Sequence, residues 1–294
     1  MNDFLGILDT GADVLARLVD SASRMKRDRH RHRTALAGRR IGLFFEKPST
    51  RTRVSSEVAA VEMGAYPVVL GQHEVGLGTR EAVRDVARVL DRYLDLLALR
   101  VFDHADLVEI ARYAHAPVVN LLSDLEHPCQ AVADLQTIAE HRPLDEVVVA
   151  YVGDGNNVCH SLMAGVAMLG GDMRVVCPPG FEPQEQFVRS GGDRLTISSD
   201  PGAVEGADVV YTDVWASMGQ ESEARERAEA FAGYRVDGAM FGLARTDAIF
   251  LHCLPAHRGE EVTDEVVDHP GSRVFDQAEN RLHAMKAILL ELLG

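Results

Sequence analysis

The sequence has few cysteines, and they form no pattern. Its 294 residues include only four, Cys129, Cys159, Cys177 and Cys253, with no CxxC pair and no regular spacing. Disulfide frameworks and structural zinc sites both favour closely spaced cysteines. The composition therefore argues against a secreted disulfide scaffold and predicts reduced thiols in a cytoplasm.

Long apolar runs and a basic excess are missing too. No stretch approaches membrane-spanning length, and "FLGILDTGADVL" (4–15) lacks the basic region and apolar core of a signal peptide. We therefore expect a soluble cytoplasmic protein. Basic residues number 30 against 45 acidic ones, which argues against nucleic acid or an anionic membrane as the main partner. The basic stretch at 24–33 is interpreted as a solvated helix end.

Apolar runs alternate with helical patterns along the whole chain. Strands are expected at "RRIGLFF" (39–45), "YPVVL" (66–70) and "APVVNLL" (116–122), and a helix at "EAVRDVARVLDRYLDLL" (81–97). The second half repeats the alternation. Such a pattern predicts an α/β fold with mainly parallel sheets flanked by helices.

The length of the chain and a helix end followed by Pro143 predict two domains. A boundary near "AEHRPLDE" (139–146) separates residues 1–140 from 141–278, and the last helix, 279–294, is expected to pack back on the first domain. In open α/β sheets, ligands bind beyond the carboxyl ends of strands. The candidate functional residues are therefore those that follow strands.

The stretch "FFEKPSTRTR" (44–53) combines hydroxyls and guanidinium groups where a strand turns into a helix. Pro48 biases Lys47 away from helix, and Ser49 or Thr50 is a good N-cap. The free N–H groups of such a helix, with Arg51, would suit a phosphate. The alternative is an ordinary capped helix with surface arginines.

Four further segments follow predicted strands. In "SDLEHPCQAVADLQ" (123–136), His127 and Gln130 are spaced to reach one pocket, and Pro128 suits a first helical turn. "GDGNNVCHS" (153–161) is a Gly-rich turn without the GxGxxG fingerprint. "TDVWASMGQE" (212–221) places Asp213 at a strand end before a polar loop that resembles an active-site flap.

The last of the four segments, "LHCLPAHRGEE" (251–261), places Cys253 just after a hydrophobic strand. Together with His127 and Cys129, the adjacent His252 and Cys253 raise the alternative of a zinc site. Neighbouring residues on a strand point to opposite faces, which argues against that alternative.

In this order, these segments resemble the transcarbamylase family, and within it the ornithine carbamoyltransferases. "STRTR", "HPCQ", "DVWASMG" and "HCLPAHRGEE" carry the resemblance, which covers nearly the whole chain. It implies two α/β domains joined by interdomain helices, the first binding carbamoyl phosphate and the second ornithine. It also implies a homotrimer with carbamoyl phosphate near a subunit interface, and neither metal nor cofactor.

The resemblance implies a role for each matching residue. The phosphate would be held by Ser49, Thr50, Arg51 and Thr52, and the carbamoyl group by Arg100, His127 and Gln130, with Arg281 closing the pocket. Ornithine would be bound by Asn157, Asp213, Ser217 and Met218. Cys253 and the Leu254 carbonyl would contact the reacting centre. The catalytic residues would be Arg51 and His127, where negative charge develops, and Asp213 and Cys253, near the proton leaving ornithine.

Two departures from the family pattern leave alternatives open. Ser56 stands where the family usually has Phe, and Gly76 stands at a polar position of a loop expected to reach a neighbouring subunit. The alternatives are a carbamoyltransferase for another amine, such as putrescine or N-acylornithine, and a weakened binding paralogue. "DVWASMG" with "HCLPAHRGEE" favours free ornithine. Nothing in the sequence distinguishes synthesis of citrulline from its breakdown.

Overall fold

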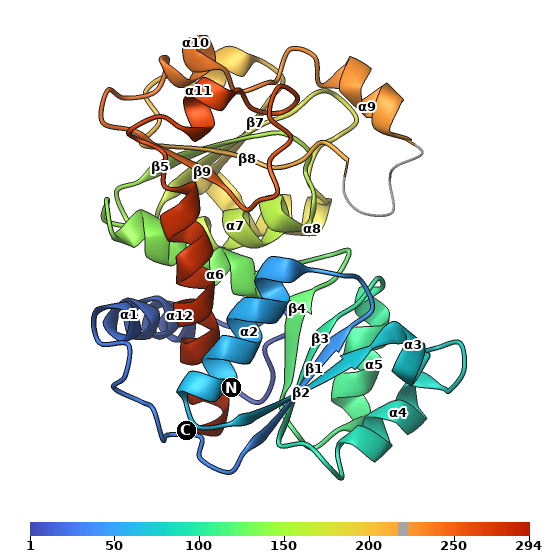
Figure 1. Ribbon diagram of the computed structural model, residues 1–294. Helices are drawn as coiled ribbons and strands as arrows, with labels where there is room; N and C mark the ends of the chain where they lie inside the picture. The colour runs from blue at the N-terminus through green and yellow to red at the C-terminus, as the bar shows by residue number, and fades with distance from the viewer. Residues whose placement is uncertain (217–222) are drawn as a thin grey trace. The chain divides into compact units, whose positions relative to one another are not determined.

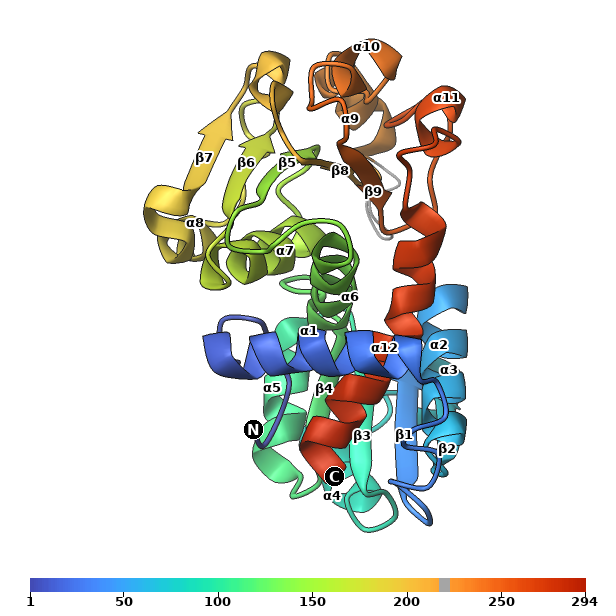
Figure 2. The same ribbon diagram turned by 90° about the vertical axis from the view of Figure 1, so that its left-hand side faces the viewer.

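The computed structural model describes residues 1–216 and 223–294, which separate into two units (Figures 1 and 2). Unit 1 comprises Met1–Gln136 with Glu279–Gly294, and unit 2 comprises Thr137–Ala278. Two helices, α6 (Pro128–Ala139) and α12 (Val274–Leu293), run across the division. Within the described ranges, no helix is both long enough and apolar enough to cross a membrane.

Unit 1 contains a four-stranded parallel sheet in the order β2-β1-β3-β4. In Figure 1, α4 and α5 cover one face of this sheet, and α2 and the C-terminal part of α12 lie on the other. The strands are β1 (Arg40–Phe45), β2 (Tyr66–Gly71), β3 (Leu96–Arg100) and β4 (Val118–Leu122). The remaining helices are α1 (Ala12–Arg27), α2 (Thr50–Glu62), α3 (Gln72–Val75), α4 (Val83–Leu90) and α5 (His104–Tyr113).

Unit 2 contains a five-stranded parallel sheet in the order β7-β6-β5-β8-β9. In Figure 1, α7 and α8 cover one face, and α10 and α11 the other. The strands are β5 (Val148–Val152), β6 (Asp172–Val176), β7 (Leu195–Ser198), β8 (Val209–Thr212) and β9 (Ile249–His252). The helices are α7 (Asn157–Met168), α8 (Glu185–Gly191), η1 (Gly192–Arg194), η2 (Pro201–Val204), α9 (Ala224–Ala230), α10 (Gly238–Phe241) and α11 (Asp264–Val267).

The predicted alternation of strands and helices is confirmed, with one correction. The helix expected over 81–97 is wrong in its last third, because the helix ends at Leu90 and β3 begins at Leu96. The apolar residues at helical spacing run on through Leu94 to Leu97, but Leu97 lies in β3. β3 lies between β1 and β4 and is buried along its length, so the sheet decides the conformation of this segment.

Both sheets change direction beside their first strand. In unit 1, β1 lies between β2 and β3, and in unit 2, β5 lies between β6 and β8. The chain therefore proceeds to one side of the first strand and later crosses to its other side. Sheets of this kind bind ligands at such a reversal, here at the carboxyl ends of β1 and β3 and at those of β5 and β8, which we call the crevices of unit 1 and unit 2. The segments singled out in the sequence follow these strands.

A buried lysine ties the C-terminal helix to the rest of unit 1. Lys286 on α12 is 1% exposed, and its ammonium donates to the Arg29 carbonyl at 2.6 Å and to Glu62 Oε2 at 3.2 Å. Glu62, the last residue of α2, also accepts from Arg29 Nε at 2.7 Å. One carboxylate therefore neutralises two cations where α2, α12 and the segment after α1 meet.

We expect Glu62→Ala to destabilise the protein much more than Lys286→Met. Removing Glu62 leaves the Lys286 ammonium buried without its counter-charge, which costs about 3 kcal/mol of unfolding free energy. Replacing Lys286 by an apolar side chain of similar length removes the buried charge itself, so the change should stay within about 1 kcal/mol. Urea unfolding of both variants measures the difference, and equal losses would contradict this account.

The Glu62 contribution should also depend on pH. Burial raises the pKa of Glu62, but hydrogen bonds from Arg29 and Lys286, with their charges, outweigh it and lower the pKa. Glu62 in the unfolded chain has a pKa of about 4.3, and at pH values above this its lower pKa in the folded protein contributes fully to stability. This contribution is lost as the pH falls through the pKa of the folded state. The gap between wild type and Glu62→Ala should therefore shrink in acid.

Candidate functional site

The crevice of unit 1 begins with the turn from β1 into α2. Ser49 is the N-cap of α2, and its hydroxyl accepts from the Thr52 amide at 3.3 Å, which confirms one of the two caps that the sequence allowed. The other N–H groups of the first turn stay available to a ligand beyond β1. A helix N-terminus in this position attracts an anion through its dipole and its N–H groups.

Arg281 joins three helices at the start of α2. Its guanidinium is buried and donates to Thr52 Oγ1 at 3.0 Å and to the side-chain oxygen of Gln130. Gln130 in turn donates to Asp134 Oδ1 at 2.7 Å. The structure thus brings together Thr52, Gln130 and Arg281, three residues that the family resemblance assigned to one pocket.

His127 and Arg100 are both buried in unit 1. Arg100 ends β3 directly opposite Phe45, the last residue of β1, so it lies across the crevice from the start of the phosphate-binding segment. Burial lowers the pKa of His127 well below its usual value, and the charges of Arg281 and Arg100 lower it further. His127 is therefore neutral near pH 7 and can donate one N–H without adding charge.

Lys47 is a cation of this crevice that the sequence analysis did not select. It directly precedes Pro48, is only 8% exposed, and places its ammonium 4.2 Å from the centroid of the Phe102 ring. Burial and the charge of Arg100 lower its pKa, and the charges of Asp124 and Glu46 offset this only in part. No described residue forms an ion pair with it. A buried cation beside other cations favours an anionic ligand.

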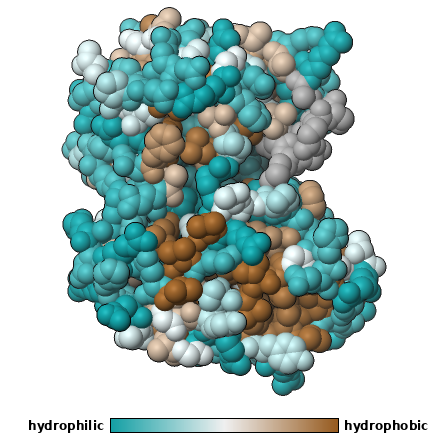
Figure 3. Space-filling view, in the orientation of Figure 1, coloured by the Kyte–Doolittle hydropathy of each residue, from teal (hydrophilic) through white to brown (hydrophobic). Residues whose placement is uncertain are grey.

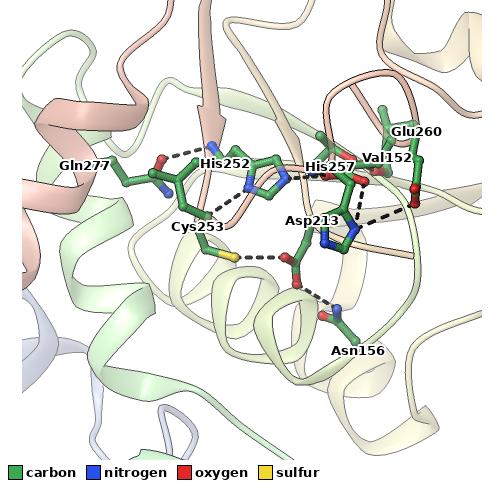
Figure 4. Close-up of polar contacts among 11 residues, drawn as sticks. Val152, Asn156, Asp213, His252, Cys253, His257, Glu260 and Gln277 are labelled. Carbon is green, nitrogen blue, oxygen red and sulfur yellow. Dashed lines mark hydrogen bonds and ion pairs between the residues drawn. The ribbon is translucent and has the colours of Figure 1, made fainter. Parts of the chain in front are cut away.

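In unit 2, strand register brings two predicted residues together. Thr212 of β8 pairs with His252 of β9, so the residues that follow, Asp213 and Cys253, leave the sheet side by side. The Cys253 thiol donates to Asp213 Oδ1 at 2.9 Å (Figure 4). Asp213 is buried and Cys253 is partly exposed. The pair offers a hydrogen-bonding and proton-accepting group to a polar ligand.

Asn156 holds the other oxygen of Asp213. Its amide donates to Asp213 Oδ2 at 2.9 Å (Figure 4). Its side-chain oxygen caps α7 by accepting from the Val158 and Cys159 amides. The resemblance assigned the next residue, Asn157, which begins α7. The resemblance did not assign Asn156, although an Asn before an apolar helix is an N-cap signal. Ser217 and Met218, also assigned to ornithine, lie outside the described residues.

The zinc alternative meets chemical obstacles in both units. In unit 1, the Cys129 thiol is buried, burial raises its pKa to about 12, and it donates to the Asn120 carbonyl at 3.3 Å. It is a poor source of thiolate. In unit 2, Asp213, His252 and Cys253 lie close enough to share an ion, but both His252 nitrogens already have hydrogen-bond partners. His257, Glu260 and Glu261 form a second close group.

Gly76 fits its loop for a conformational reason. It caps the C-terminus of α3 at φ 64°, in the left-handed region, and a Cβ added there would lie 2.6 Å from the Arg80 Cβ. A side chain at this position therefore needs a shift of Arg80 as well as a strained backbone. Ser56, the other departure, lies on the buried face of α2.

Sequence profiles of one family match both units. The "carbamoyl-P binding domain" of aspartate/ornithine carbamoyltransferase matches residues 2–140, and its "Asp/Orn binding domain" matches residues 145–292. The ornithine carbamoyltransferase of Acidothermus cellulolyticus is 50% identical over 99% of this chain and 96% of that protein. That of Methanoculleus marisnigri is 47% identical over 99% of this chain and 97% of that protein.

Solved structures agree with the profiles. The ornithine carbamoyltransferase of Pyrococcus furiosus matches with a TM-score of 0.96 at 46% identity, covering 100% of this chain and 97% of that one. An acetylornithine transcarbamylase complexed with acetylcitrulline matches with a TM-score of 0.89 at 31% identity, covering 100% of each chain. With the geometry of both crevices, these similarities establish that the chain belongs to the aspartate/ornithine carbamoyltransferase family.

Proposed function

We propose that this chain transfers the carbamoyl group of carbamoyl phosphate to the δ-amino group of L-ornithine, giving L-citrulline and phosphate. The observation that carries the proposal is the cation cluster in the crevice of unit 1, formed by Lys47, Arg100 and Arg281 beside the start of α2, in a chain with net charge −15. The names of the relatives support ornithine as the acceptor, since the acetylornithine enzyme is less similar in sequence.

Unit 1 would hold the phosphate through groups that donate hydrogen bonds. We assign this role to Ser49, Thr50, Arg51 and Thr52. The hydroxyls and first-turn amides donate to phosphate oxygens, and the Arg51 guanidinium presents paired donors. Arg281, already bonded to Thr52, fixes one side of the pocket. Phosphate is thereby held as a leaving group whose growing charge is balanced.

The carbamoyl group would be bound by Arg100, His127 and Gln130. As the amine attacks, negative charge develops on the carbamoyl oxygen, and donors placed there in advance stabilise it more than they stabilise the substrate. Neutral His127 donates one N–H, and Arg100 supplies a full charge. Gln130 would exchange its bonds with Asp134 and Arg281 for the carbamoyl amide.

Unit 2 would bind ornithine through Asn157, Asp213, Ser217 and Met218, with Cys253 and the Leu254 carbonyl at the reacting centre. Ornithine arrives as an ammonium, and deprotonating a group of pKa about 10.4 at pH 7 costs roughly 4 to 5 kcal/mol. Asp213, hydrogen-bonded to the Cys253 thiol, can accept this proton, which frees the nitrogen lone pair to attack the carbamoyl carbon. The second proton, lost by the nitrogen once the new bond has formed, leaves with the phosphate. The carbon–oxygen bond to phosphate then breaks. An activated carbamoyl donor makes a cofactor unnecessary.

We further propose a homotrimer acting in the cytoplasm. β2 is an edge strand, and α2 exposes Val54 and Val61, so apolar side chains gather on that face of unit 1 (Figure 3). Monomers rarely leave such a face uncovered. The four cysteines are free thiols, which supports a reducing compartment.

The proposed function is tested with purified protein, carbamoyl phosphate and a panel of amines. We expect citrulline from ornithine at a rate at least about 100-fold above the product rates with putrescine or N-acetylornithine, since an amine that leaves buried polar groups unpaired is strongly rejected. Cys253→Ala should lower kcat with ornithine while keeping the affinity for carbamoyl phosphate. If only another amine gave a product, that amine would replace ornithine as the proposed acceptor. If no amine gave a product, the proposal would be overturned.

Lys47→Met should weaken carbamoyl phosphate binding about 10-fold or more, the worth of one hydrogen bond to a charged group. It should keep or slightly raise the stability of the ligand-free protein, because it removes a buried cation that Arg100 repels and that forms no ion pair among the described residues. Arg53→Met is the matched control, since Arg53 is exposed on α2 and pairs with Glu57. Calorimetric titration measures both affinities, and equal effects of the two changes would contradict the role of Lys47.

Light scattering during size-exclusion chromatography should give three times the chain mass of 32.1 kDa. Val61→Lys places a charge on the exposed apolar face of α2 and should shift the protein towards smaller species, whereas Val89→Lys, at an exposed position of α4, should not. A monomer mass for the unmodified chain would refute the trimer.

A further inference from the structure

His252, the residue before Cys253, forms a buried pair with Glu261. His252 ends β9 and is 1% exposed, while Glu261 is fully buried. His252 Nε2 and Glu261 Oε1 are 3.2 Å apart. Neither residue is among those assigned to either substrate. Two ionisable groups buried together next to a reacting thiol call for an explanation beyond packing.

Hydrogen bonding defines the state of the His252 ring. The Leu254 amide donates to Nδ1 at 2.8 Å, so Nδ1 carries no proton. In the neutral ring the proton is then on Nε2, which donates it to Glu261. Both nitrogens are in use, and the His252 amide itself donates to Gln277 Oε1 at 2.9 Å. The orientation of the ring is therefore fixed by hydrogen bonds to the Glu261 carboxylate and the Leu254 amide.

The backbone at Leu254 needs such a support. Its φ is 60°, and it is the sole non-glycine residue of the described ranges with a positive φ. A branched side chain pays a steric penalty in this region and stays there only when its surroundings hold it. Glu261 Oε1 also accepts from the His257 amide at 2.6 Å. One carboxylate oxygen thus anchors the turn at both ends, through the His252 ring and through His257.

We propose that His252 and Glu261 are positioning residues, which hold Leu254 in its left-handed conformation so that the Cys253 thiol and the Leu254 carbonyl are presented in the geometry the carbamoyl transfer needs. The inference rests on the proposed function. His252 and Leu254 are joined by a hydrogen bond and flank Cys253 in the sequence. The Cys253 thiol in turn contacts Asp213. A small rotation at Leu254 would move both groups away from the reacting atoms.

Two substitutions of His252 separate the hydrogen bond to Leu254 from the hydrogen bond to Glu261. The asparagine side-chain oxygen in His252→Asn reaches the place of Nδ1, so it can still accept from Leu254, but the bond to Glu261 is lost. The glutamine nitrogen in His252→Gln reaches the place of Nε2, so it can still donate to Glu261, but the Leu254 amide loses its acceptor. The variants therefore remove one hydrogen bond each from the same site.

We expect His252→Gln to lower kcat about 10- to 100-fold, the equivalent of one unsatisfied buried donor. Its affinity for carbamoyl phosphate should stay within about twofold, because the residues assigned to the phosphate are in unit 1. His252→Asn should keep kcat within about fivefold of wild type, because the Leu254 amide keeps its acceptor and Glu261 still holds the turn through the His257 amide. It should lose thermal stability with the buried bond to Glu261. A packing role alone would give both variants the same loss, with no split between kcat and affinity.

Thiol chemistry gives a readout that does not require turnover. Cys253 is partly exposed, whereas Cys129, Cys159 and Cys177 are buried, so slow alkylation by iodoacetamide reports on Cys253. The rate should rise several-fold in His252→Gln, where the thiol is released from Asp213, and stay near the wild-type value in His252→Asn. Equal alkylation rates and equal kcat losses in the two variants would overturn the positioning role. Absence of citrulline from the wild type, with the alkylation difference intact, would overturn the proposed transfer instead.

Discussion

The parallel pairing of strands around β1 and β5 is the constraint on which both crevices depend. Parallel strands end at the same edge of a sheet, and a reversal of strand order leaves the space beyond that edge uncovered. In unit 1 this edge carries the β1–α2 turn and Arg100. In unit 2 it carries Asn156 and Asp213, with Cys253 one strand further along. A slip of one residue in the pairing of β8 with β9 would separate Asp213 from Cys253 and turn one of them to the opposite face.

In each crevice, neighbouring polar side chains hold the groups assigned to substrate in place. Arg281 is held by Thr52 and Gln130, Asp213 by Asn156, and the Leu254 amide by His252. Apart from Gln130, whose bonds would be exchanged for the carbamoyl amide, these groups are therefore fixed before any ligand arrives. Such pre-organisation is what electrostatic catalysis requires, because donors that must rearrange during the reaction contribute less.

Local patterns predicted the features that depend on local physics. The alternation of elements, the cap at Ser49 and the start of α6 at Pro128 all follow from propensities within a few residues. Local patterns could not predict features that depend on contacts between distant parts of the chain. Arg281 meets Thr52 across 229 positions of sequence, and the Lys47 ammonium lies over the Phe102 ring. The segment of β3 is a strand despite its helical pattern because it lies in the middle of a sheet. The roles of Ser49, Arg100, His127 and Asp213 came from resemblance, since residue type alone left ordinary structural alternatives.

The cations buried in the crevice of unit 1 have a consequence outside catalysis. Their mutual repulsion raises the free energy of the empty protein, and a bound anion relieves it, so ligand and folding are linked by mass action. A ligand at 100 times its dissociation constant adds about 2.7 kcal/mol to the unfolding free energy. That gain is a substantial share of the margin by which ordinary domains stay folded. In a cell, the lifetime of this protein against proteolysis would therefore rise and fall with the supply of its phosphorylated substrate.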